Sequence, residues 1–147
     1  MPITIRTILR AGAFLMLTAT PGLAATPCDG IWQKDKAQGL TMLKPFLAKE
    51  RITSQPARAK VFDHMQVGDW HMVWAEFADA EPGGFVIHDS KLLQTWGGAG
   101  PETARENTQW MLQQVKAMPK PLAACFGWYS AGGREKSPPA WKNPFSR

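Results

Sequence analysis

In the segment KVFDHMQVGDWHMVWAEF, residues 60–77, the hydrophobic period of the chain changes from that of a helix to that of strands. Apolar and polar residues alternate on both sides of Gly68 and Asp69, which is the pattern of two half-buried strands. A glycine in first place suits the tight turn of a hairpin. We therefore expect an antiparallel hairpin, with a short helix over residues 56–65 as the alternative for its first half.

The sequence after the hairpin extends it into a sheet. The run FVIHDSKLLQTW, residues 85–96, predicts two further strands around the turn Asp89-Ser90-Lys91. The run PLAACFGWYS, residues 121–130, predicts a fifth strand.

Helical spacing of apolar residues appears on either side of this sheet. Residues 35–52 predict one kinked helix or two short helices, because Gly39 and Pro45 interrupt the pattern. Residues 101–118 predict a second helix, with Pro101 and Glu102 suited to its first turn. The sequence thus predicts an α+β domain with a mostly antiparallel, curled sheet of about five strands and two or three helices packed on one face.

Simple hairpin registers divide the strand residues between two faces. The assumed pairs are Val67 with Trp70, Phe77 with Gly84, and His88 with Leu92. One face is then almost wholly apolar and is expected to pack the helices: Val61, Met65, Val67, Trp70, Met72, Trp74, Phe85, Ile87 and Leu93. The other face contains all three histidines of the chain: Phe62, His64, Gln66, His71, Val73, Ala75, Phe77, Val86, His88, Leu92, Gln94 and Trp96.

The three histidines provide the candidate chemistry. His64, His71 and His88 on one face are candidate ligands of an open zinc site, although no His-x-His or His-x-x-x-His spacing supports it. The alternative is that they are half-buried polar members of an amphipathic sheet.

A nucleophile–base arrangement is a second possibility. Ser90 is the candidate nucleophile near His71, and Asp69, two residues from His71, projects to the same side; His88 is a further candidate catalytic residue. No Gly-x-Ser-x-Gly motif surrounds Ser90, and Asp89-Ser90-Lys91 is also ordinary turn chemistry.

An open face of this composition suits a sugar or hydrophobic peptide, because most ligand sites combine apolar walls with a few polar groups. The candidate ligand-binding residues are His64, Gln66, His71, Phe77, His88, Gln94 and Trp96. The alternative for Trp96 is that it closes the rim of the sheet.

The N-terminus and the two cysteines indicate the compartment. Residues 1–25 contain two arginines, a short apolar core and small residues before Thr26, which is the pattern of a cleaved secretory signal peptide. Cys28 and Cys125 are the only cysteines, and an oxidising compartment predicts a disulfide between them. We expect a periplasmic or secreted protein with one domain over residues 26–130 and a loosely ordered C-terminal tail over residues 131–147.

The charge and the glycine-rich loop exclude several classes of function. Without Arg6 and Arg10 the net charge falls from +5 to +3, and the basic residues are scattered, so no nucleic-acid partner is expected. No segment after the signal peptide is long and apolar enough to span a membrane. Pro101 and Glu102 follow the glycines where a phosphate loop needs amide donors and no acid, so no cofactor is expected.

No motif identifies a family. The leading interpretation is a small exported, disulfide-stabilised binding or interaction module of the cell envelope, without catalysis and with an unknown envelope ligand or protein partner. The alternative is a small periplasmic hydrolase or metal-binding protein that uses the histidines of the open sheet face. A third hypothesis is a structural or inhibitory envelope protein that binds through its tail and tryptophans.

Overall fold

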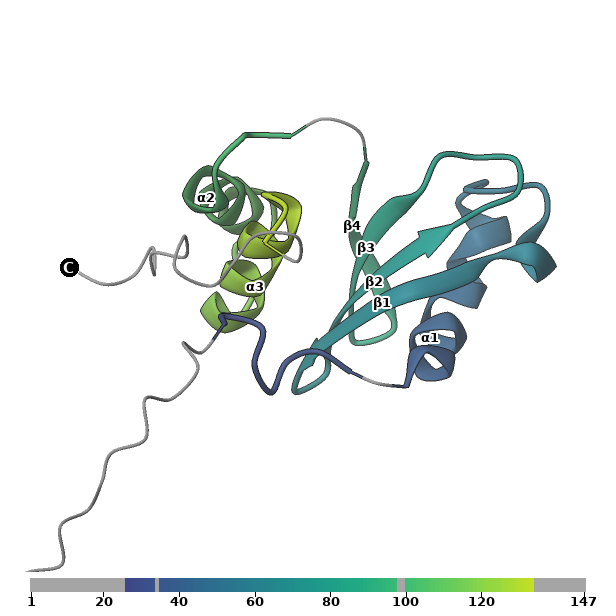
Figure 1. The fold of residues 1–147 in the computed structure, drawn as a ribbon. Coiled ribbons are helices and arrows are strands. Elements are labelled where there is room, and N and C mark those ends of the chain that lie inside the picture. The colour runs from purple at the N-terminus through teal and green to yellow at the C-terminus, as the bar shows by residue number, and fades with distance from the viewer. Residues whose placement is uncertain (1–25, 34, 98–99, 134–147) are drawn as a thin grey trace, which may run out of the picture.

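The computed structural model describes residues 26–33, 35–97 and 100–133 (Figure 1). The signal peptide predicted over residues 1–25 lies outside these ranges, as does the predicted tail from residue 134 onward. In chain order, the elements are α1 (Lys36–Lys49), the short 3₁₀ helix η1 (Pro56–Arg58), β1 (Lys60–Val67), β2 (Trp70–Glu76), β3 (Gly83–His88), β4 (Lys91–Trp96), α2 (Ala104–Gln114) and α3 (Lys120–Ser130).

The α+β class is confirmed, with an open antiparallel sheet in the order β1-β2-β3-β4. The sheet has four strands and not five, because residues 121–130 form part of α3. Every residue from Leu122 to Gly127 is buried. A continuous apolar run of this length fits a buried helix as well as a buried strand, so its pattern could not distinguish the two.

The helix over residues 35–52 is the single 14-residue α1, in spite of Gly39 and Pro45. The carboxylate of Asp35 caps it by accepting from the amides of Ala37 and Gln38. The alternative helix over residues 56–65 is limited to η1, after which β1 begins.

The register of the first hairpin is confirmed from Asp63 to Trp74, since Val67 pairs with Trp70. A register shift between Val61 and Asp63 then places Val61 on the α1 side, opposite to the predicted face. The register between β2 and β3 is wrong by three residues, because Gly84 pairs with Trp74 and not with Phe77. β2 ends at Glu76, and the loop that leads to β3 leaves Ala75 paired with Gly83. An odd shift moves every side chain of a strand to the opposite face, so β3 and β4 are inverted relative to the prediction.

The turn between β3 and β4 also differs from the prediction at its tip. His88 pairs with Lys91 rather than with Leu92, and Asp89 and Ser90 form a two-residue turn. Both have positive φ (49° and 55°), as a type I′ hairpin turn requires. A register shift between Val86 and Ile87 then restores the expected pairing of Val86 with Gln94.

The helices cover both faces of the sheet, which corrects the prediction that they pack on one face. Figure 1 shows α1 on one side of the sheet and the α2–α3 pair on the other. The core on the α1 side contains Leu43, Phe46, Leu47, Ala59, Val73, Ala75, Phe85 and Ile87. The core on the α2–α3 side contains Cys28, Ile31, Met65, Trp70, Met72, Trp74, Val86, Met111, Val115, Met118, Leu122, Ala123, Cys125 and Phe126. The histidine face expected to be open is therefore the face covered by α1.

The predicted disulfide is confirmed and joins Cys28 to Cys125 in α3 across 97 positions of sequence. The segment after Cys28 runs along β1, where Trp32 forms an antiparallel bridge with Met65. The amide of Gln33 donates to the carbonyl of His64 (2.8 Å), and that of Gln66 donates to Ile31 (2.9 Å). Among the described residues, no helix has the length and apolar content needed to cross a membrane.

Candidate functional site

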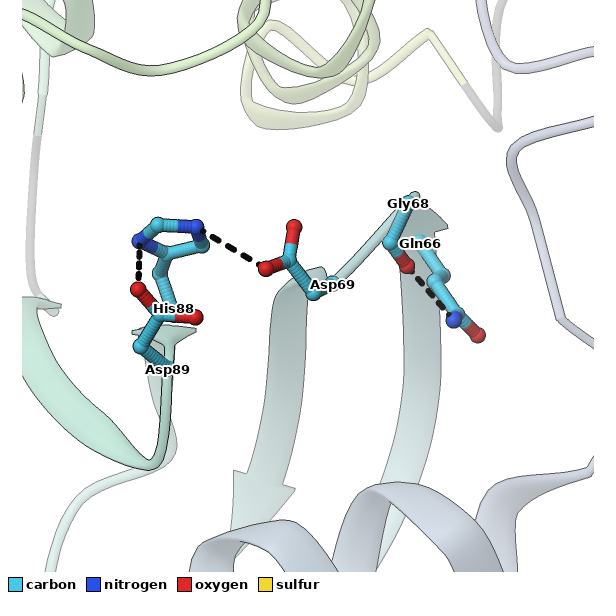
Figure 2. Close-up of polar contacts among 5 residues, drawn as sticks. All are labelled: Gln66, Gly68, Asp69, His88 and Asp89. Carbon is cyan, nitrogen blue, oxygen red and sulfur yellow. Dashed lines mark hydrogen bonds and ion pairs between the residues drawn. The ribbon is translucent and has the colours of Figure 1, made fainter.

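Three of the residues around the two hairpin turns converge at one end of the sheet. Asp69 belongs to the β1–β2 turn, His88 ends β3, and Asp89 begins the β3–β4 turn. The two turns meet because Trp70 pairs with His88 across β2 and β3. We call Asp69, His88 and Asp89 the turn-end cluster (Figure 2).

The imidazole of His88 lies between the two carboxylates. Its Nε2 is 3.2 Å from Asp69 Oδ2, and its Nδ1 is 3.7 Å from Asp89 Oδ2. The side chain of His88 is 26% exposed, whereas those of Asp69 and Asp89 are 66% and 64% exposed. The ring stacks on Trp70 with the centroids 4.0 Å apart and 14° between the planes. A fixed imidazole is thus flanked by two carboxylates that face solvent.

The electrostatics of the cluster favour a negative charge. The pKa of Asp69 is lowered mainly because its carboxylate accepts a hydrogen bond from its own backbone amide. The contacts of this carboxylate with Asp89 and His88 act in the same direction. Among the described residues, no lysine or arginine forms an ion pair with either carboxylate. The surroundings of His88 therefore suit a cation.

The same three residues can offer metal ligands. One ligand atom from each of Asp69, His88 and Asp89 lies within 4.8 Å of the other two. Imidazole nitrogen and carboxylate oxygen are both ordinary zinc ligands.

The other two histidines form a buried pair under α1. His64 is 0% exposed and His71 is 5% exposed, and their rings stack with centroids 5.3 Å apart. His64 Nε2 lies 3.0 Å from His71 Nδ1, and His64 Nδ1 lies 3.2 Å from the backbone oxygen of Asp35. A carbonyl oxygen can only accept, so His64 Nδ1 carries a hydrogen, and in the neutral pair His64 Nε2 accepts from His71.

Burial lowers the pKa of both histidines of this pair. For His64, the loss of hydration outweighs the opposing effect of Asp35. For His71, burial is again the largest cause, the charge of His64 adds to it, and Asp69 opposes it. Both imidazoles are therefore neutral at neutral pH.

The predicted three-histidine set is divided between the two faces. His64 and His71 lie on the face of the sheet that α1 covers, whereas His88 lies on the opposite face with Trp70 and Val86. The inverted register of β3 causes this separation, because it moves His88 to the opposite face. The structure does not bring the three imidazoles together.

The remaining predicted site residues have separate environments. The amide of Gln66 donates to the carbonyl of Gly68 (2.8 Å) and braces the β1–β2 turn (Figure 2). Trp96 contacts Trp110 and Phe126 and closes the rim of the α2–α3 core. Phe77 packs on its edge against Phe85 on the α1 side, and Gln94 is half-buried opposite Val86.

Ser90 lies away from the buried pair. It lines a surface depression of about 260 Å³ whose other walls come from α1: Thr41, Met42, Pro45, Phe46 and Lys49. Among the described residues, no serine, threonine or cysteine side chain hydrogen-bonds to a histidine. The predicted nucleophile–base contact is not formed.

Sequence reasoning missed Asp89 and Trp70 as parts of this site. The sequence pattern predicts only a turn at Asp89 and only a core position for Trp70. A two-residue turn between β3 and β4 is the feature that would have placed the side chain of Asp89 beside the ring of His88.

The chain matches no protein-family model, and no match was found among curated proteins or solved structures.

Proposed function

We propose that the protein is a small exported binding module of the cell envelope, held together by its disulfide, which binds a cationic ligand at the turn-end cluster without catalysis. The disulfide supports the export part of this proposal, because such bonds persist in oxidising compartments. The signal-like composition of residues 1–25 supports it independently.

The turn-end cluster is the observation that carries the binding part. It places two solvent-facing carboxylates on either side of one ordered imidazole, at the tip of a rigid sheet. The imidazole belongs to the last residue of a strand, and side chains on strands hold their geometry more precisely than side chains on loops. Carboxylates without a lysine or arginine partner attract ammonium, guanidinium or metal cations.

The absence of catalysis is part of the proposal and rests on the surroundings of His88. A general base needs a nucleophile or a bound proton donor within hydrogen-bond reach. In the described parts of the chain, the polar contacts of His88 are with carboxylates and not with a serine, threonine or cysteine, which supports a binding role over a nucleophile–base pair.

A thermal-shift comparison tests the proposal. The exported protein, without an affinity tag, is screened against divalent metals, polyamines, basic peptides and neutral envelope glycans. A cation specific for the cluster should raise the melting temperature by mass action, and the glycans should not. Mass measurement of the exported chain reports whether residues 1–25 have been removed.

Matched variants show whether a shift comes from the cluster. The double variant Asp69→Asn/Asp89→Asn removes both carboxylates and should abolish the shift. Glu81→Gln removes one exposed carboxylate from the loop between β2 and β3 and should retain it. A flat screen, or a shift that is equal in all three proteins, would contradict the proposal.

A further inference from the structure

We propose that the ligand of the turn-end cluster is a divalent transition-metal ion of the zinc class, bound by Asp69, His88 and Asp89. This inference rests on the proposed function, because it names the chemical class of the cation for the same site. It differs from the three-histidine site predicted from the sequence, since His88 is the one residue common to both.

The donor set selects the class of metal. One imidazole nitrogen with carboxylate oxygens suits zinc and its neighbours among the first-row metals. Calcium and magnesium prefer sites made only of oxygen atoms. Three protein ligands at the end of the sheet, two of them on exposed turns, also leave room for water to complete the coordination sphere.

The site combines one fixed ligand with two adjustable ligands. His88 is ordered by its stacking on Trp70 and is only about a quarter exposed. Zinc ligands lie about 2.0–2.2 Å from the ion, so two ligand atoms of one ion are at most about 4.4 Å apart. The present upper separation of 4.8 Å is slightly larger, and the exposed carboxylates can close it by rotation.

Charge supplies a reason for a cation to bind there. Asp69 and Asp89 come from different turns and both face the same imidazole (Figure 2). Two carboxylates on one imidazole repel each other, and a divalent ion bound by both offsets that repulsion.

The buried histidine pair does not compete for the ion. Both nitrogens of His64 and Nδ1 of His71 already have hydrogen-bond partners. Both rings also lie beneath α1 and are closed to solvent. The two kinds of histidine in the protein therefore provide an internal comparison.

Calorimetric titration of the untagged exported protein with ZnCl₂, CaCl₂ and MgCl₂ tests the inference. We expect one zinc ion per chain and no saturable binding of calcium or magnesium. Loss of an outer-shell partner of a zinc site typically costs 10–100-fold in affinity, so loss of a direct ligand should cost at least about tenfold. Asp69→Asn and Asp89→Asn should each weaken zinc binding by that factor, whereas Glu81→Gln should leave it unchanged.

These variants should retain the fold. Both side chains are mostly exposed, and asparagine tolerates the left-handed backbone (φ 49°) found at Asp89. A denaturation midpoint equal to that of the wild type, measured without metal, checks this for each variant. If one variant is destabilised, the other still tests the site.

Imidazole NMR signals identify the histidine that binds. Zinc should shift the ring resonances of His88 and leave those of His64 and His71 in place. The inference is overturned if zinc does not bind, if calcium binds equally well, or if His64 or His71 responds instead of His88. Equal zinc affinity in the aspartate variants would also overturn it.

The outcome for the metal is separable from the outcome for the proposed function. If zinc does not bind but a polyamine or basic peptide binds in a manner that depends on both aspartates, the metal inference is wrong and the cation-binding function stands. If no cation depends on the cluster, both are wrong.

Discussion

The two faces of the sheet differ in how their helices are held. On the α2–α3 side, large aromatic and sulfur-containing side chains fill the space between the layers, and the disulfide ties α3 to the N-terminal segment. On the α1 side, the contacts are mainly aliphatic. A polar contact between the sheet and α1 on that side is the hydrogen bond from His64 to the backbone oxygen of Asp35 at the start of α1.

The two helix layers on this sheet thus depend on different chemistry. The α2–α3 layer depends on a covalent bond and on close packing of one helix against another. The α1 layer contains a buried pair of imidazoles, and burial disfavours the protonated form of both. Redox state should therefore affect the first layer most, and pH the second.

Removal of the disulfide should give the largest effect. In the chain-entropy model, a crosslink between residues 97 positions apart stabilises the fold by about 4 kcal/mol. The variant Cys28→Ala/Cys125→Ala should lose about this amount in chemical denaturation, and the wild-type protein in reducing buffer should behave similarly. Equal midpoints in oxidising and reducing buffer would contradict the prediction.

Gly127→Ala should cause the next largest loss of folding stability. A Cβ at Gly127 in α3 would overlap Thr108 Oγ1 and the backbone oxygen of Ala104, both in α2. Overpacking of this kind costs about 1–3 kcal/mol, and a clash with backbone belongs at the upper end of that range. Urea denaturation monitored by tryptophan fluorescence measures the loss.

Gly39→Ala in α1 is the matched control for that substitution. A Cβ there would lie 3.2 Å from Cγ of His64, a tight contact with a side chain rather than with backbone. Alanine is also favoured over glycine inside a helix by about 1 kcal/mol. We expect a change within about 1 kcal/mol of zero. An equal loss for Gly39→Ala and Gly127→Ala would show that the two helix layers are packed with the same tolerance.

Acid should weaken the α1 layer through the buried histidine pair. The folded-state pKa of both His64 and His71 is below the ordinary value of 6.5. Below about pH 6.5 the unfolded chain takes up protons before the folded chain does, so stability falls with decreasing pH. Each histidine that remains neutral in the fold contributes at most about 1.4 kcal/mol per pH unit, until its own folded pKa is reached.

Denaturation between pH 7.5 and 5 measures this slope, and NMR titration of the imidazoles assigns it to the pair. Hydrogen exchange should rise first in α1 and last in α2 and α3. Stability that is constant or increases as the pH falls from 6.5 would contradict the prediction.

Much of the fold could be predicted because local signals agree with it. The glycine at position 68 and the alternation around it gave the first hairpin with its correct register. Two cysteines in an otherwise cysteine-free chain gave the disulfide. The α3 segment was misassigned because residues 122–127 are buried on all sides, and a residue buried on all sides leaves no periodicity in the sequence.

The candidate site was predicted only in part. Asp69 and His88 were named, but as members of sets that also included His71, His64 and Ser90. The error came from the predicted pairing of β2 with β3, which depends on the length of the loop between them. An odd error in a register changes the face of every later side chain, so a small mistake there separated the three histidines.

The α+β class, the first hairpin and the cysteine pair follow from the sequence alone, because each depends on residues that are neighbours in the chain or unique in it. Which side chains share a face, the helices on both faces of the sheet and the contact of Asp89 with His88 are visible only in the folded chain. These features depend on long-range registers and helix packing, where the free energy is distributed over many contacts and leaves no single local signal.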